Sequence, residues 1–151
     1  MADVASALQQ KIRSSIPLSE AMQFNITSLS ANSISVSAPL QPNVNIHGTG
    51  FAGSIYSIAV LTGWALCVHI MDELGFDGDL VVASAEIRYR SPVTGDLLCS
   101  TATSATEREN FASNFISIGK AKLRLQVDVG DDSSAVLHAS YVAVSRAKSA
   151  V

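Results

Sequence analysis

Charged residues are scarce in this sequence. Asp, Glu, Lys and Arg make up 15% of its 151 residues, against about a quarter in an average soluble domain. Ten basic and thirteen acidic residues give a net charge of −3, so the basic surplus typical of a nucleic-acid binder is missing and we expect no such partner. Because 48% of the residues are hydrophobic, the chain also lacks the composition of a disordered tail.

Cysteine is also scarce. Cys67 and Cys99 stand far apart in apolar stretches. Two such thiols make neither a disulfide framework nor a zinc site. We interpret them as buried free thiols of a protein in a reducing, cytoplasmic compartment. We expect no secretory signal, because Asp3 comes early and no uninterrupted apolar run follows before Ile16.

One run without formal charge, residues 52–71, is long enough to cross a membrane. Glycine, serine, threonine and histidine interrupt it, and its near flanks carry no Lys or Arg. A spanning helix normally has basic residues close to one end. We therefore expect residues 53–74 to form one helix that the rest of the protein wraps and that ends at Gly75, with no membrane partner.

Alternation of apolar and polar residues predicts the strands. The segments that read as strands are 23–30, 33–38, 83–90, 96–105, 121–129 and 135–145. A short amphipathic helix is predicted over 4–16, and an irregular stretch or short helical turn over 106–116. Strands with one polar face favour an antiparallel sheet. We predict a single α+β domain over 1–151, in which a curved antiparallel sheet wraps one long central helix.

A glycine-rich turn precedes that helix. Gly48, Gly50 and Gly53 fit the letters of the dinucleotide motif G-x-G-x-x-G, but no buried strand leads into them and no acid follows at the end of a second strand. Such a turn exposes backbone N–H groups at the positive end of the helix dipole, which suits an oxyanion or a polarised carbonyl. The alternative, a tight turn that needs only the freedom of glycine, stays open.

Polar side chains gather in the same turn. His47 is either a titratable group of a site or a solvated loop residue. Asn43 and Asn45 are either turn formers or amides that orient a water molecule or a ligand.

Further along the helix, His69, Asp72 and Glu73 share one face. A carboxylate-bridged metal needs ligands from facing helices, and this chain has one long helix. We expect helix capping and ion pairing there, no metal and no cofactor.

Several motifs together are typical of a known superfamily. They are Ile16-Pro17-Leu18, Ala38-Pro39-Leu40-x-Pro42-Asn43-x-Asn45, His47-Gly48-Thr49-x-Phe51-Ala52-Gly53-Ser54-Ile55-Tyr56, Leu61-Thr62-Gly63-Trp64 and Ile87-Arg88-Tyr89-x-x-Pro92-Val93. Over about residues 15–145 the chain resembles the hotdog-fold thioesterases, and among them the YiiD C-terminal domain type. The resemblance implies five or six strands around the helix, a homodimer or a dimer of dimers, and acyl thioesters carried on coenzyme A or acyl carrier protein.

The resemblance also implies roles for residues of the turn. Gly53 would polarise the thioester carbonyl through its N–H group, and His47 would orient or deprotonate water with help from Asn45 or Ser54. The substrate-binding residues would be Asn43, Gly48, Thr49, Phe51 and Ser54. Many such thioesterases carry a carboxylate in the second turn of the helix, where this chain has Val60. We therefore expect an acyl-thioester hydrolase, with a non-catalytic acyl-binding or assembly module as the alternative.

Overall fold

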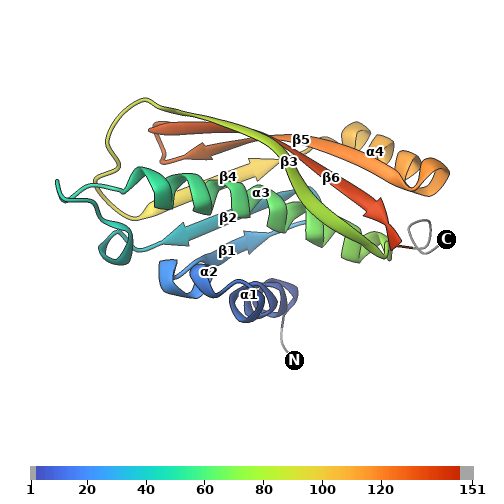
Figure 1. Cartoon of the computed structure of the whole chain (residues 1–151), viewed down its shortest axis with the longest axis horizontal. Coiled ribbons are helices and arrows are strands. Elements are labelled where there is room, and N and C mark those ends of the chain that lie inside the picture. The colour runs from blue at the N-terminus through green and yellow to red at the C-terminus, as the bar shows by residue number, and fades with distance from the viewer. Residues whose placement is uncertain (1–2, 147–151) are drawn as a thin grey trace.

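The computed structural model describes residues 3–146, in which four α-helices, one short 3-10 helix and six strands follow one another (Figure 1). The helices are α1 (Val4–Ser15), α2 (Pro17–Met22), the 3-10 helix η1 (Gln41–Asn43), α3 (Ala52–Leu74) and α4 (Ala105–Ile118). The strands are β1 (Asn25–Leu29), β2 (Ser33–Ala38), β3 (Gly78–Tyr89), β4 (Leu97–Ala102), β5 (Lys120–Val129) and β6 (Ala135–Ser145).

All six strands of the described chain join one antiparallel sheet in the order β1-β2-β4-β5-β6-β3. The sheet curves around α3 (Figure 1). This confirms the predicted α+β fold, with one long central helix against an antiparallel sheet of five or six strands.

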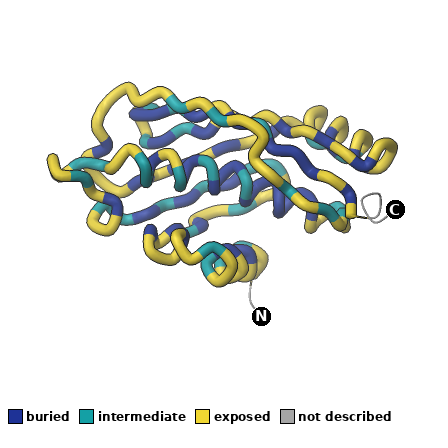
Figure 2. Tube along the Cα trace, viewed as in Figure 1, coloured by how far each residue is buried: buried dark blue, intermediate teal, exposed yellow. Residues whose placement is uncertain are grey.

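The two edges of the sheet differ. At β1, the side-chain oxygen of Gln9 accepts a hydrogen bond from the N–H of Ile26 at 2.6 Å, so α1 covers that edge. At the other edge, β3 pairs only with β6 in the described chain, and a bulge interrupts the pairing between Val82 and Ser84. Most residues of β3 are exposed or half-exposed (Figure 2). An open edge of this length is a surface on which another strand can pair.

α3 fills the inside of the sheet, with buried residues from Ile55 to Met71. Within residues 3–146 it is the one helix long and apolar enough to cross a membrane, and 72% of its most apolar window is buried inside the protein. Its last turn is closed by Gly75, whose φ of 70° is left-handed and suits glycine. The predicted wrapped helix and its end at Gly75 are confirmed.

Cys67 and Cys99 are free and fully buried, as predicted. Burial raises the pKa of both thiols, to about 12 for Cys99. Neither thiol is in the ionised, nucleophilic form near neutral pH.

Three elements differ from the prediction. No helix was predicted after Pro17, where α2 forms over Pro17–Met22. Residues 106–116 lie within α4, a regular helix of 14 residues that packs Phe111 and Phe115 against the core. β3 begins at Gly78, five residues before the predicted strand at residue 83. Leu80, Val81 and Val82 near its start are three consecutive apolar residues. They lack the alternation of apolar and polar residues by which the other strands were predicted.

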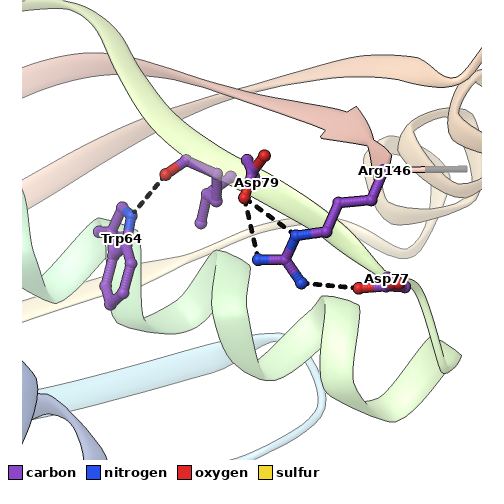
Figure 3. Close-up of polar contacts among 5 residues, drawn as sticks. Trp64, Asp77, Asp79 and Arg146 are labelled. Carbon is purple, nitrogen blue, oxygen red and sulfur yellow. Dashed lines mark hydrogen bonds and ion pairs between the residues drawn. The ribbon is translucent and has the colours of Figure 1, made fainter. Parts of the chain in front are cut away.

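Side-chain contacts hold the start of β3 in place (Figure 3). The indole N–H of Trp64 on α3 donates to the carbonyl of Leu80 at 3.1 Å. Arg146, which follows β6, forms ion pairs with Asp77 at 2.7 Å and Asp79 at 2.9 Å. The edge strand is thus attached both to the central helix and to its neighbour β6.

Candidate functional site

A closed loop precedes α3, and Asn45 fills it. Val44 and Gly50 form a bridge across its base. The Oδ1 of Asn45 accepts hydrogen bonds from the N–H groups of His47 at 2.8 Å and Thr49 at 3.1 Å. Its Nδ2 donates to Thr49 Oγ1 at 3.0 Å and to the Gly50 carbonyl at 3.2 Å. Because both ends of the amide are used inside the loop, Asn45 and Thr49 shape the loop and have little left to offer a ligand.

His47 lies at the tip of this loop and is exposed. Gly48, with φ of 79°, supplies the left-handed residue that the turn needs. Within residues 3–146 the imidazole has no hydrogen-bond or ion-pair partner, and the loop projects beyond the start of α3 (Figure 1). His47 is therefore free to meet a ligand or a second protein chain.

Asn43 is an internal anchor. It is 1% exposed, and its Nδ2 donates to the carbonyls of Met22 at 2.9 Å and Pro39 at 2.8 Å. The backbone carbonyl of Asn43 accepts a hydrogen bond from the N–H of Phe51 at 2.8 Å. These bonds fix the residue that directly precedes α3 to the ends of α2 and β2. Asn43 thus has a structural role: it holds the start of α3 in place and is too buried to contact a ligand.

α3 begins without a side-chain cap. Its N-cap residue is Phe51, which has no oxygen to accept a hydrogen bond, and the first N–H bonded across the helix start is that of Ile55, to the Phe51 carbonyl at 2.9 Å. Within the described chain, the N–H groups of Ala52, Gly53 and Ser54 have no partner. Three unpaired donors at the positive end of a helix of 23 residues favour an anion or a carbonyl oxygen.

Gly53 makes room for an aromatic ring. A Cβ atom at this position would lie 2.6 Å from Cε2 and 2.9 Å from Cζ of Phe51. The space that the sequence suggested for a ligand is thus filled by the Phe51 ring, which is 52% exposed. Phe51 and Gly53 together form an apolar wall beside the unpaired N–H groups.

The segment at the end of β3 holds the start of α3 from outside. The hydroxyl of Tyr89 donates to the Ala52 carbonyl at 2.8 Å, and the Val93 carbonyl accepts from the N–H of Gly50 at 2.8 Å. Burial and the nearby Tyr56 raise the pKa of Tyr89. The phenol is therefore a protonated donor near neutral pH. No spacing pattern in the sequence predicts this role of Tyr89, because only the fold brings residues 37 positions apart together.

One face of α3 leads away from the unpaired N–H groups. Gly53, Ser57, Val60 and Trp64 follow one another at helical spacing and are all half-buried. We call these four residues the half-buried stripe of α3. Val60 in this stripe occupies the position where the resemblance implied a carboxylate. The first acidic residue of the helix is Asp72.

The stripe ends in a groove of about 720 Å³ between α3 and β3. Its apolar lining is Trp64, Val68, Met71, Phe76, Leu80 and Val81. Charged side chains of Lys11, Asp72, Asp77, Asp79 and Arg146 line the rest of the groove.

The polar cluster at the far end of α3 has structural partners. Nε2 of the buried His69 lies 3.6 Å from Oε1 of Glu73, and Nη2 of Arg108 on α4 binds the same oxygen at 3.0 Å. Arg108 also binds the carbonyl of Ala31. The cluster joins α3, α4 and the β1–β2 turn, and no group suited to a metal occurs among residues 3–146. The predicted ion pairing of Glu73 is confirmed.

The start of α3 therefore gathers what polarisation of a carbonyl requires. Gly53 and Ser54 contribute N–H donors, Phe51 an apolar wall, and Gly48, Thr49 and the two asparagines the loop that holds them in place. His47 is close to these donors in sequence and is exposed, and its imidazole forms no hydrogen bond with them in the described chain.

Comparisons with known proteins identify the family and the fold of the chain. The family model described as "Putative thioesterase (yiiD_Cterm)" matches residues 5–145. A "putative thioesterase" from Shewanella oneidensis is 40% identical, with a TM-score of 0.85 over 95% of this chain and 99% of that one. A protein of unknown function from Chlorobaculum tepidum is 26% identical, with a TM-score of 0.91 over 95% of each chain.

A more distant likeness supports the fold alone. A thioesterase from Haemophilus influenzae is 11% identical, with a TM-score of 0.72 over 96% of this chain and 93% of that one. Since the family model covers nearly the whole chain, this protein belongs to the YiiD C-terminal putative thioesterase family.

Proposed function

We propose that this protein hydrolyses acyl thioesters of coenzyme A or of an acyl carrier protein. The observation that carries the proposal is the set of three unpaired N–H groups at the start of α3. In attack on a thioester, negative charge develops on the carbonyl oxygen, and preorganised N–H donors stabilise that charge more than they stabilise the substrate. The Gly53 N–H is the donor that we assign to this oxygen, with the Ser54 N–H beside it.

The acyl chain then follows the half-buried stripe of α3. Val60 and Trp64 lie about 10 Å and about 16 Å along the helix axis from Gly53, from the rise per residue of an α-helix. The groove beyond Trp64 combines apolar side chains of α3 and β3 with a charged rim that includes Asp72, Asp79 and Arg146. An acyl group of small or medium length therefore remains in contact with apolar side chains.

Water is the second substrate, and His47 is the group that we assign to orient or deprotonate it. Its imidazole is exposed and has no competing partner in the described chain. General-base assistance of this kind typically contributes about 10²–10⁴ in rate. Asn45 acts indirectly, because its Oδ1 binds the His47 N–H and so fixes the loop.

A panel of acyl-CoA substrates, from acetyl to palmitoyl, tests the proposal through the thiol that is released. We expect turnover on at least one member of the panel and competitive inhibition by a non-hydrolysable thioether analogue. If the protein binds the analogue but releases no thiol from any substrate, including an acyl carrier protein thioester, it is the non-catalytic acyl-binding module instead. The absence of an acid on α3 before Asp72 is the observation that favours this second candidate.

Replacing His47 by alanine is expected to lower kcat at least tenfold and to leave the melting temperature unchanged, because the imidazole makes no contact that stabilises the fold. The matched control is His138→Ala, which removes another exposed histidine on β6, whose one side-chain partner among residues 3–146 is Gln126. The assay is turnover on the best acyl-CoA at saturating concentration. Equal rates for the two variants would remove His47 from the mechanism.

We also propose that two copies pair through β3. In the described chain the strand is open along its outer edge and carries exposed Val81 (53%) and Val82 (40%) in its first half. Exposed apolar residues on an unpaired edge favour strand addition across a two-fold axis.

The Val81→Lys variant is expected to be a monomer by light scattering at micromolar concentration, because a two-fold pairing would bring two lysines close together. Val144→Lys places the same charge on the interior strand β6, where Val144 is 36% exposed, and should leave the dimer intact. A wild-type protein that is itself monomeric at this concentration would refute the dimer.

A further inference from the structure

The first turn of α3 has few stabilising interactions within the helix itself. It has no side-chain cap, and its second residue is Gly53. Glycine within a helix is less favourable than alanine, because its backbone loses more conformational freedom on folding. A helix start of this kind frays unless contacts from elsewhere in the fold restrain it.

Tyr89 supplies such a contact. Its hydroxyl donates to the Ala52 carbonyl at 2.8 Å, in the turn that carries the three unpaired N–H groups. The Ala52 carbonyl also belongs to the helix ladder, in which it accepts from the N–H of Tyr56. Tyr89 therefore binds the same carbonyl from outside the helix, at the site itself.

Tyr89 is also the last residue of β3, the open edge strand. The chain directly after it is fixed, because the N–H groups of Arg90 and Ser91 both donate to the Ser134 carbonyl, at 2.7 and 3.1 Å. The phenol thus extends from a well-anchored strand end to the start of α3. The hydroxyl is protonated near neutral pH, as an ordinary phenol is, and is therefore able to donate.

We propose that Tyr89 is a positioning residue: through its hydrogen bond to the Ala52 carbonyl it holds the first turn of α3 in the geometry that binds the thioester oxygen, and it thereby couples the edge strand β3 to the site. The catalytic part of this inference rests on the proposed hydrolase activity, whereas the positioning part concerns the helix alone. The two parts can be tested separately.

Tyr89→Phe is the decisive variant, since it deletes the hydroxyl and keeps the ring. We expect kcat to fall about three- to tenfold, which is what the loss of one ordinary hydrogen bond allows, with KM and the melting temperature nearly unchanged. We expect the amide of Tyr56, followed by hydrogen exchange, to exchange about three- to tenfold faster. Tyr56→Phe is the matched control, because it removes a neighbouring phenol for which no hydrogen bond is formed in the described chain, and it should change neither kcat nor exchange in this turn.

The outcomes separate the two proposals. Faster exchange in Tyr89→Phe supports the positioning role even if no acyl thioester is hydrolysed by the wild-type protein, a result that would refute the hydrolase alone. Exchange and kcat both equal to wild type would overturn the role of Tyr89. A rise in KM without a change in kcat or exchange would overturn it as well, because it would show that the hydroxyl contacts substrate and does not act through the helix.

Discussion

Gly63→Ala is expected to lower the free energy of unfolding by about 3 kcal/mol, the upper end of the usual range for an overpacked core. A Cβ atom at this position would meet the Tyr141 hydroxyl oxygen and would lie 2.7 Å from Cζ and 2.9 Å from Cε2 of the same ring. Tyr141 is fully buried, and its hydroxyl donates to the Val60 carbonyl at 2.7 Å. A rigid ring enclosed on all sides cannot yield as a flexible side chain would.

Chemical denaturation of three variants measures this effect. Tyr141→Phe alone should cost about 1 kcal/mol for the lost hydrogen bond. The double variant Gly63→Ala/Tyr141→Phe should be less destabilised than the sum of the single variants, because deleting the hydroxyl removes the closest clash. A Gly63→Ala protein as stable as wild type would show that α3 and β6 are packed less closely than the structure describes.

Val60→Asp is expected to raise kcat at least tenfold. Val60 is half-buried on the face of α3 that begins at Gly53, in the third turn of the helix. Many thioesterases of the superfamily that the chain resembles carry a carboxylate at the matching position. A carboxylate there adds a general base or nucleophile to a site that already has its N–H donors, and such groups typically contribute about 10²–10⁴ in rate. Placing a charge at a half-buried position should lower the free energy of unfolding modestly, which does not alter kcat of the folded protein.

Val60→Asn is the matched control, because it has nearly the same shape as aspartate and no basic oxygen. Turnover of both variants and of wild type on the same acyl-CoA gives the answer. A gain confined to Val60→Asp shows that the site is built for the reaction and lacks only the acid. Equal rates for aspartate and asparagine would contradict the assignment of the thioester to this face of the helix.

Local sequence signals predicted most of the fold. The uncharged run before Gly75 predicted α3, and the strict alternation after Lys120 predicted β5, because burial on all sides and burial on one side leave different patterns. The missed helix α4 also had a signal. Ser104 and Glu107 have the spacing of a capping box, and the Ser104 hydroxyl does accept from the Glu107 N–H at 3.1 Å.

The candidate site was predictable only in part. The glycine-rich turn before a helix predicted free N–H groups near Gly53, because that depends on residues adjacent in sequence. The contact of Tyr89 with Ala52 and the burial of Asn43 depend on where β3 and α2 lie in the fold. The packing of the Phe51 ring over Gly53 depends on the rotamer of Phe51, and residue spacing in the sequence does not predict a rotamer.

The burial of Cys67 and Cys99 has a practical consequence for every assay that counts released thiols. In the folded protein both sulfurs are shielded from solvent and protonated near neutral pH, so a thiol reagent should report the product alone. Once the chain unfolds, the same reagent should take up two equivalents per molecule. A single reagent can thus serve as the activity readout at low temperature and as a chemical measure of the unfolded fraction on heating, without a label being added to the protein.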